Sequence, residues 1–457
     1  MLLPRTTRID QRQAGVSAVA VLCALLGMAQ TSAAQDAPTA ADAEPLPSVS
    51  LAAAQAPEPA QAEARPAPAN RLIEEIVVTS QKREENLQDV PIAVQAFSAE
   101  ALDAKGISNA VDLQTSTPGL SYTVLQSFSI IYLRGVGTDA FLPSADLSVA
   151  TYVDGIYFPF SAGLAQEFGA VERVEVLKGP QGTLFGRNST GGAISTTTRQ
   201  PGRDFETSIA TGYGNDSDLR TRVYTNIPLS DTWAVSVSAL YNRKDSYYEH
   251  VSRDLRQDVD RGARAKLRWT PNDELDITLT GLIAQTDAST GSQATQIEPK
   301  PAFAALLANY PLKDYKTDID KPAVFDFSNR VGYFDAKWTP GPLDLRLLGS
   351  TQSISTLAFN DFDATALPLV SFDTRGLFAD IQTAELQFIS NDESWGSDWL
   401  KYIGGLFYIH SKAGFDPATL FVGFFDPAAI PVIGSPFGAA IDQLLDLVDK
   451  GGYEKAI

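Results

Sequence analysis

The sequence predicts a mainly β protein in which a mixed α/β domain sits inside a transmembrane antiparallel β-barrel that is incomplete in this chain. Three observations support this fold class. Residues 90–200 mix short apolar runs with a helix start and many glycines, whereas residues 201–457 contain long segments of alternating apolar and polar residues. The links between those segments alternate between short and long. The N-terminus has the form of an export signal.

That signal covers residues 1–34. Three arginines precede an apolar stretch at 14–29, and Ser32-Ala33-Ala34 supplies the small residues where a signal peptidase cuts. The stretch is too short and too poorly flanked for a permanent membrane helix, although an uncleaved anchor stays the alternative. Elsewhere the sequence has no run of about 18 apolar residues, which excludes a helical membrane protein.

The composition excludes two further classes of protein. With 55 acidic and 36 basic residues the formal net charge is −19, which argues against a nucleic-acid binder that neutralises phosphates. The only cysteine, Cys23, lies inside the predicted signal peptide, so the mature chain has none. Disulfides, thiol catalysis and cysteine metal sites are therefore excluded together.

A linker precedes the first predicted domain. Residues 35–70 are dominated by alanine and proline without an apolar period, which predicts a disordered tether. Residues 71–89 contain the short β-branched run LIEEIVVTS and then the charged stretch QKREENLQD.

The domain predicted at 90–200 combines strands, a short helix and glycine-rich loops. VPIAVQAFS is typical of a strand, and Ser98 is a candidate N-cap for the helix that follows. Glycines crowd 179–192, which predicts repeated backbone turns. Because no lysine follows them at the spacing of a nucleotide-binding loop, we interpret this stretch as packing loops that fit against the barrel wall.

The barrel is predicted from the alternation after Gln200. In TWAVSVSALYNRK one face carries Trp233, Val235, Val237, Ala239 and Tyr241, and the other carries Ser236, Ser238 and Asn242. A soluble sandwich would turn the polar face outward, whereas a membrane barrel turns it to the lumen. Nine strands are predicted, near 205–213, 218–228, 232–243, 262–270, 275–286, 328–339, 343–352, 379–390 and 399–410.

The links favour the membrane barrel. Short links occur at LSD, TPNDE, TPGP and NDESWGSD, and long ones at 244–261, 287–327 and 353–378. Outer-membrane barrels have short periplasmic turns, long extracellular loops and aromatic girdles. Four tryptophans adjoin the short links: Trp233, Trp269, Trp338 and Trp399.

Several motifs resemble a known family. The segments EIVVT, VPIAVQAFSAEAL, LQTSTPGLSY, IYLRGVGT, ATYVDGIYF and VERVEVLKGPQGTLFGRNSTGGAISTTTRQP follow one another in the order seen in TonB-dependent outer-membrane receptors. The resemblance implies that 71–89 holds the TonB box and a linker, that 90–200 is the plug domain, and that 201–457 is the N-terminal part of the barrel. Matching motifs follow closely on one another over 75–200, whereas over 205–410 the resemblance rests on the strand pattern alone.

The TonB box is the segment by which TonB grips such receptors from the periplasm. The resemblance assigns it to Glu75, Ile76, Val77, Val78 and Thr79. An extended β-branched segment, exposed between a tether and a folded domain, can add to a partner's open sheet edge through main-chain hydrogen bonds. The alternative is that this run is the first strand of the plug.

Residues of the plug motifs are implicated as well, namely Arg134, Gly135, Asp154, Gly155, Lys178, Gly179, Gly182, Arg187, Gly191 and Gly192. Three of them are cations beside glycines in a region expected to be enclosed, where charges need partners. We expect acidic groups on the lumen face of the barrel to pair with these cations. Solvated loop charges are the alternative.

No catalytic, metal or cofactor site is predicted. The two histidines, His250 and His410, lie near loop ends, and the acidic loop with Asp361, Asp363 and Asp373 is interpreted as a solvated surface. No Ser-His-Asp or paired-carboxylate arrangement stands out.

The resemblance therefore implies energy-coupled uptake of a scarce ligand, a ferric siderophore first and otherwise cobalamin or a carbohydrate. The partners would be the periplasmic C-terminal domain of TonB with its inner-membrane energy-coupling complex, a small metal chelate and outer-membrane lipid. A non-transporting surface binding module or inactive remnant, and a secreted β-sandwich enzyme, are the alternatives. Because plugged barrels have about 22 strands, we expect this chain to be a fragment or a truncated product.

Overall fold

The computed structural model describes residues 77–79, 82–83, 85–88, 90–125, 128–139, 145–160, 170–246, 248–252, 254–288, 315–321, 324–361, 366, 370–397, 399–415 and 418–422. The chain divides into two compact units, Met1–Arg71 and Leu72–Ile457, and every described residue belongs to the second. The predicted signal peptide and tether therefore lie outside the described residues, as do Glu75 and Ile76 of the predicted TonB box.

The first folded region, called the plug below, is built on a five-stranded sheet. Its order is β3 (Val94–Ser98), β9 (Val171–Lys178), β10 (Gly192–Thr198), β7 (Val149–Val153) and β8 (Ile156–Tyr157). The β10–β7 pair is parallel and the other pairs are antiparallel. A three-stranded sheet follows the order β4 (Leu120–Leu125), β5 (Phe128–Leu133) and β6 (Val136–Gly137).

Three short helices complete the plug: α2 (Ala99–Ala104), the 3-10 helix η2 (Asp112–Thr115) and α3 (Gly182–Phe185). The predicted N-cap is confirmed, since Ser98 Oγ accepts a hydrogen bond from the Ala101 N–H at 3.3 Å. Leu102 and Leu113 from the helices pack with Val174 and Val176 of β9 in one core. Among the described residues, no helix is both long enough and apolar enough to cross a membrane.

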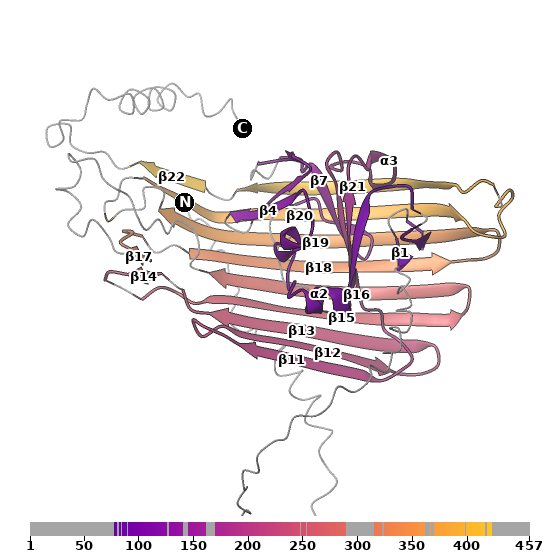
Figure 1. Cartoon of the computed structure of the whole chain (residues 1–457), viewed down its shortest axis with the longest axis horizontal. Coiled ribbons are helices and arrows are strands. Elements are labelled where there is room, and N and C mark those ends of the chain that lie inside the picture. The colour runs from indigo at the N-terminus through magenta and orange to yellow at the C-terminus, as the bar shows by residue number, and fades with distance from the viewer. Residues whose placement is uncertain are drawn as a thin grey trace, which may run out of the picture. The chain divides into compact units, whose positions relative to one another are not determined.

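The second folded region, called the wall below, is a ten-stranded antiparallel sheet (Figure 1). Its order is β11 (Glu206–Tyr213), β12 (Leu219–Pro228), β13 (Trp233–Lys244), β15 (Asp258–Asn272), β16 (Leu275–Ala288), β18 (Val324–Trp338), β19 (Leu343–Asp361), β20 (Val370–Ser390) and β21 (Ile403–Phe415), with β22 (Ala418–Val422) also paired to β20. All nine predicted strands are present in the predicted order. Successive wall strands are neighbours, as alternation with tight links predicts.

The two faces of β13 show which environment the wall is built for. The polar residues Ser236, Ser238 and Asn242 are buried, whereas Trp233 and Tyr241 are exposed. Ile209 on β11 is 70% exposed and Leu406 on β21 is 72% exposed. A sheet in a water-soluble protein buries its apolar side chains and exposes its polar ones. This sheet buries hydroxyl groups and exposes large apolar side chains, which is the arrangement of a barrel whose outer surface faces lipid. This arrangement favours the membrane barrel over the soluble sandwich.

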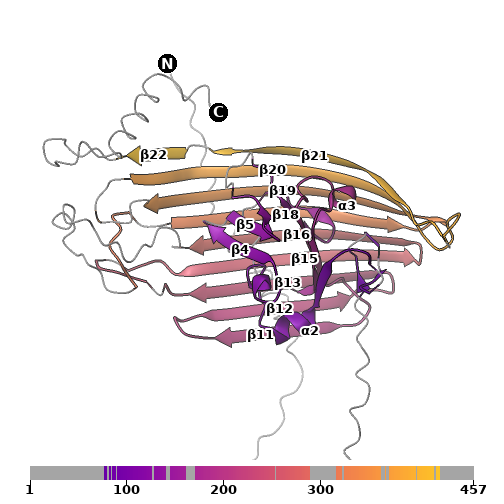
Figure 2. The same cartoon turned by 45° about the horizontal axis from the view of Figure 1, so that its top comes forward.

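The plug lies against the middle of the wall in both views (Figures 1 and 2). Phe128 and Phe160 of the plug share an apolar cluster with Phe325 and Phe327 of β18 and with Leu377 of β20. The expectation of a polar lumen face, right for β13, is therefore wrong for this part of β18. The reason is that the plug covers these side chains, so they are shielded from water as core residues are.

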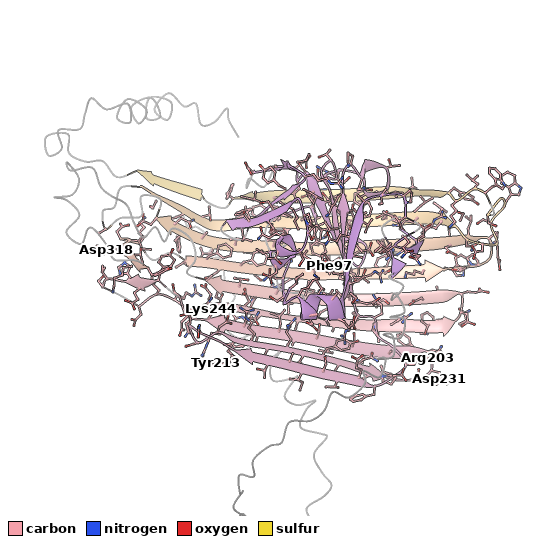
Figure 3. All side chains as sticks on the ribbon, in the orientation of Figure 1. Phe97, Arg203, Tyr213, Asp231, Lys244 and Asp318 are labelled. Carbon is pink, nitrogen blue, oxygen red and sulfur yellow. The ribbon has the colours of Figure 1, made fainter. Side chains whose placement is uncertain are left out.

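The links separate into two groups at opposite ends of the wall. At one end lie 229–232, 273–274, 339–342 and the described residues of 391–402, and at the other lie 214–218, the described residues of 245–257, and 315–321. Figure 3 places Arg203 and Asp231 at the first end and Tyr213, Lys244 and Asp318 at the second. The long link predicted at 353–378 is shorter than predicted because the two strands that flank it take up its residues: β19 has 19 residues and β20 has 21. Since about 9–11 residues cross the membrane, these strands project beyond it.

The tryptophans gather where the sequence predicts them. Trp233 and Trp338 adjoin the links 229–232 and 339–342, and each is partly exposed. The rings of Trp233 and Trp269 stack with centroids 5.5 Å apart. Such a row is typical of a girdle at a membrane–water interface.

Two short strands lie outside these sheets, in the links at the far end. The strand β14 (Glu249–His250) pairs in parallel with β17 (Lys316–Thr317). The Lys316 ammonium lies 2.8 Å from the Glu249 carboxylate across this pair.

Candidate functional site

The N-terminal hairpin (described residues of 77–88) contains three residues of the predicted TonB box. Its strand β1 (Val77–Val78) pairs antiparallel with β2 (Glu85–Asn86). The turn closes where the Lys82 N–H donates to the Thr79 carbonyl at 2.8 Å. Within the described part of the chain the hairpin is a separate two-stranded sheet, not a strand of either plug sheet.

The expectation that the box is exposed is wrong for Val78. Its side chain is 0% exposed, and the neighbouring Thr79 is half-buried. The reason is that the hairpin folds back onto the plug and the wall through contacts from residues distant in sequence. A segment of this length shows no amphipathic pattern from which such docking can be predicted.

Thr79 is held by a buried carboxylate of the plug. The Thr79 N–H donates to Glu175 Oε1 at 2.8 Å, and its hydroxyl donates to the same oxygen at 3.1 Å. Arg173 Nε also donates to Glu175 Oε1, at 2.9 Å, and Arg173 Nη2 donates to the Thr79 hydroxyl at 3.3 Å. The Glu175 side chain is 0% exposed.

The far part of the hairpin is held by the wall. The Lys82 ammonium pairs with the Glu385 carboxylate on β20. The Arg83 guanidinium donates to Ser390 Oγ at 3.0 Å and to the Tyr402 carbonyl. Lys401 lies 3.5 Å from the Glu85 carboxylate. These contacts place the hairpin at the end of the wall that carries the short links, which is the periplasmic end of an outer-membrane barrel.

A second set of contacts joins the turn between β7 and β8 to the wall. The Asp154 carboxylate is buried. It accepts hydrogen bonds from the Thr198 N–H at 2.8 Å and the Thr198 hydroxyl at 2.7 Å, both within the plug. From the wall it accepts the Tyr333 hydroxyl at 2.6 Å and the Lys266 ammonium at 3.0 Å.

These contacts decide the charge state of Asp154. Burial alone would raise the pKa of its carboxyl, but the charges of Lys266 and Arg264, with hydrogen bonds from Thr198 and Tyr333, lower that pKa to about 2. Asp154 is therefore an anion throughout the physiological range.

The glycine beside Asp154 permits close approach of a wall arginine. Gly155 has φ +83°, and a Cβ added there would lie 3.0 Å from Arg346 Nη2. Arg346 donates to both oxygens of Asp335, at 2.9 and 2.7 Å, and to the Asp154 carbonyl at 3.3 Å. We call the contacts of Asp154 and Gly155 with Lys266, Tyr333 and Arg346 the plug clamp.

The expected partners of the three plug cations are not found where the sequence analysis placed them. Lys178 Nζ donates to Gln95 Oε1 at 3.0 Å and to the Pro118 carbonyl at 3.1 Å. Arg187 pairs with Asp146, and both are exposed. These partners belong to the plug, so the expectation of acidic barrel partners is wrong for both.

Arg134 also lies at a turn of the plug. It is exposed, with φ 53°, and its N–H donates to the Gly119 carbonyl at 2.7 Å. In the plug clamp the signs are reversed relative to the expectation, because a plug carboxylate meets cations of the wall. The local sequence shows that each cation lies in a turn. It does not show whether the group that faces the turn from the wall is acidic or basic.

The remaining predicted plug glycines differ in their surroundings. A Cβ on Gly192 would lie 2.2 Å from the Leu177 carbonyl, and one on Gly191 would lie 2.8 Å from the Val136 carbonyl. These two pack within the plug rather than against the wall. Gly135 and Gly179 have positive φ with open space around them, and Gly182 begins α3 in open space. The predicted repeated turns thus include one short helix.

The histidines and the acidic residues singled out in the sequence have separate contacts. His250 Nε2 lies 2.8 Å from the Ile319 carbonyl, and His410 lies opposite Gln382 in the β20–β21 pair. Asp361, at the end of β19, is 0% exposed, so the interpretation of the acidic residues as a solvated surface is wrong for it. Lys321 lies 3.7 Å from Asp373, and Asp363 lies outside the described residues. Among the described residues, no group of three or more His, Cys, Asp or Glu side chains is placed to hold a metal ion.

A cavity lies beside the plug clamp, between the plug and the wall strands β13, β15, β16 and β18. Its volume is about 120 Å³. The lining includes Thr151, Val153 and Phe158 of the plug and Asp260, Arg264 and Gln285 of the wall. The wall is therefore not sealed to the plug along its whole length.

Sequence reasoning missed Glu175, Lys82, Lys266, Tyr333, Arg346 and Glu385. One signal was available for Glu175. It stands between Val174 and Val176 in a run typical of a strand that is buried on both faces, and a charge buried in such a strand needs a partner. For the wall residues no local signal exists, since charged side chains are common on lumen faces.

Known proteins share these features. Residues 86–193 match the family described as TonB-dependent Receptor Plug Domain. The pesticin receptor of Yersinia pestis is 29% identical over 209 residues, which cover 44% of this chain and 30% of that receptor. The ferripyoverdine receptor of Pseudomonas aeruginosa is 26% identical over 170 residues, which cover 36% of this chain and 20% of that receptor. The matches thus span less than a third of each relative's length.

A solved structure shows the same fold. The ferric yersiniabactin uptake receptor FyuA from Yersinia pestis superposes with a TM-score of 0.60 at 21% identity, over 71% of this chain and 50% of that chain. The plug motifs, the wall that exposes large apolar side chains and these similarities agree with one another. Residues 86–193 match a TonB-dependent receptor plug domain, and the chain has the fold of TonB-dependent receptors of the bacterial outer membrane.

Proposed function

We propose that the protein imports a scarce ligand across the outer membrane, driven by TonB, and that residues 75–79 are the segment that TonB grips. One observation carries this proposal. The described part of that segment forms a two-stranded hairpin of its own at the short-link end of the wall. Because this hairpin has only two short strands and belongs to neither plug sheet, a pull on residues 75–79 opens it before the larger plug sheets unfold. Export through the signal peptide at 1–34 is part of the proposal.

The proposed ligand is a ferric siderophore, with cobalamin or a carbohydrate as the next candidates. The names of two similar proteins, a ferripyoverdine receptor and a ferric yersiniabactin uptake receptor, support the first class. Import of an intact chelate requires no bond to be broken, so no catalytic residue is assigned. The cavity beside the plug clamp offers a place where a small plug movement would widen a passage.

The test is a comparison of binding with uptake. Iron-starved cells that express the protein are given radioactive iron in a panel of chelates, with cobalamin and a maltodextrin in parallel. We expect one ferric chelate to be bound and accumulated. Deletion of residues 75–79 should abolish accumulation and leave binding at the surface intact. Accumulation that is unaffected by the deletion would contradict the proposal.

A non-transporting surface binding module is the second candidate. It would hold a ligand in the cavity between the plug and the wall without TonB-driven release. A chelate that binds without energy-dependent accumulation, in both the unmodified protein and the deletion variant, would favour this candidate over the importer.

A further inference from the structure

The predicted TonB box is occupied by partners from within its own chain. A partner strand that adds along Val77–Thr79 needs main-chain N–H and C=O groups of that segment. Both groups of Thr79 are already engaged, the N–H by Glu175 Oε1 at 2.8 Å and the carbonyl by the Lys82 N–H at 2.8 Å. Val77 and Val78 pair with Asn86 and Glu85 of β2. The segment in this state is therefore masked.

Glu175 is an unusual group to find at this position. It lies on β9, in register with Ala96 of β3 and Ser195 of β10, so strands flank it on both sides. Its side chain is 0% exposed, and its Oε2 has no hydrogen-bond partner among the described residues. A buried carboxylate is strongly unfavourable unless donors compensate for the lost hydration.

The donors that compensate come largely from the box. Oε1 receives the Thr79 N–H, the Thr79 hydroxyl and Arg173 Nε. Two of these three donors belong to Thr79, so Arg173 Nε is the only one of the three that remains when the box leaves. Departure of the box thus leaves a buried anion short of two hydrogen bonds, and that deficit favours the docked, masked state.

We propose that Glu175 is a positioning residue that holds the TonB box in a masked conformation, and that TonB must displace Glu175 and β2 to add its own strand. This inference rests on the proposed function. The contacts of Lys82 and Arg83 with the wall hold the tip of the same hairpin, whereas the Glu175 side chain, with Arg173 beside it, reaches the box residue Thr79 itself.

The variants Glu175→Ala and Glu175→Gln separate the hydrogen bonds from the charge. Alanine removes the acceptor. Glutamine keeps an oxygen in the place of Oε1 but removes the charge, and charge-assisted hydrogen bonds are about twice as strong as neutral ones. Glu172→Ala is the matched control, because Glu172 is an exposed neighbour whose carboxylate pairs with Arg173 and not with Thr79.

The first measurement is amide hydrogen exchange at Thr79 in the full chain, held in outer-membrane vesicles. We expect exchange about tenfold faster in Glu175→Ala, since a hydrogen bond to a charged group contributes roughly that factor or more. Glu175→Gln should be intermediate and Glu172→Ala unchanged. If Thr79 exchanges at the same rate in both Glu175 variants as in the unmodified protein, Glu175 does not hold the box.

The second measurement is binding of the purified C-terminal domain of TonB to the same vesicles without ligand. Glu175→Ala should bind about tenfold more tightly than the unmodified protein, because the competing contacts are absent. Glu175→Gln should lie between the two. Equal affinities across the series, with TonB bound, would overturn the inference while leaving the proposed function intact.

A disulfide lock tests the masking without removing Glu175. Val78 and Glu85 are Cα partners across the hairpin, at the spacing a disulfide requires, and the only cysteine of the chain is Cys23. In the double variant that carries Val78→Cys and Glu85→Cys, oxidation to the disulfide should abolish TonB binding, and reduction of the disulfide should restore it. The single variant Glu85→Cys is the control for the oxidant.

The outcomes separate the two ideas. Equal TonB binding by the oxidised and reduced lock would show that β2 does not compete, which overturns the inference. If TonB binds no form, including the reduced lock and Glu175→Ala, the proposed role of residues 75–79 fails instead. The exchange rate of Thr79 then still decides whether Glu175 masks the segment.

Discussion

The ammonium of Lys266 on β15 lies 3.0 Å from Asp154 Oδ2 in the turn between β7 and β8, and both side chains are buried. Each ion has lost its hydration and is compensated by the other and by hydrogen bonds. The pair joins the plug to the wall, so the compensation exists only while the plug is docked.

Asp154→Asn should therefore loosen the plug. The change leaves Lys266 buried without a counter-charge, which destabilises a structure by about 3–5 kcal/mol. Amide exchange over residues 149–157 and protease sensitivity of the plug measure the loss. Asp146→Asn is the control, because its pair with Arg187 is exposed and exposed pairs contribute about 1 kcal/mol or less. Equal loosening by the two variants would contradict the role of the plug clamp.

The plug clamp should weaken only in strong acid. The pKa of Asp154 falls from 3.8 to about 2 in the folded protein, so its stabilisation is present above pH 4 and is lost as the pH falls through about 2. The shift corresponds to about 2 kcal/mol. Exchange of the Thr198 N–H, followed from pH 7 to pH 2, reports this loss. An Asp154→Asn variant with the same acid profile would point to another titrating group.

Gly155→Ala should strain the same turn. The residue has φ +83°, and the new Cβ would lie 3.0 Å from Arg346 Nη2. A non-glycine residue held in an unfavourable backbone region costs about 1–3 kcal/mol, which should appear as faster exchange across the β7–β8 turn. Gly182→Ala is the matched control, since its site has no heavy atom within 4 Å and no positive φ. It should leave that exchange unchanged.

Val78→Pro tests the coupling segment by itself. Proline has no N–H and resists strand pairing, so TonB-driven uptake should be lost while the surface still binds ligand. Binding and uptake of the radioactive chelate are measured on the same cells. A parallel loss of both would show that Val78, which is 0% exposed, matters only for folding of the receptor.

The orientation of the wall can be read with single cysteines. The mature chain is predicted to contain none, since Cys23 lies in the signal peptide. Asn272→Cys, in the short-link end, should resist an impermeant thiol reagent on whole cells, whereas Ser252→Cys, in a link at the other end, should react. Both positions are exposed, so burial does not confound the comparison. Reversed labelling would invert the topology.

Features that depend on local sequence were predictable. Strand alternation has a period of two because successive side chains point to opposite faces, and it located all nine predicted wall strands. Ser98 was recognisable as an N-cap because a cap acts within one helical turn. The positions of the tryptophans at the short links were predicted from the same strand boundaries. The extension of β19 and β20 beyond their predicted ends at the long-link side was not.

What the sequence determined by itself is therefore the kind of protein and the order of its strands. Only the tertiary structure decided that Thr79 meets Glu175, 96 residues away, and that Asp154 meets Tyr333, 179 residues away. Such partners depend on where the plug docks on the wall and on which wall side chains the strand register turns toward the plug. A one-residue shift in register would turn each lumen-facing side chain of a wall strand to lipid. Local alternation shows which side chains face the lumen, but it does not show which plug residue each of them meets.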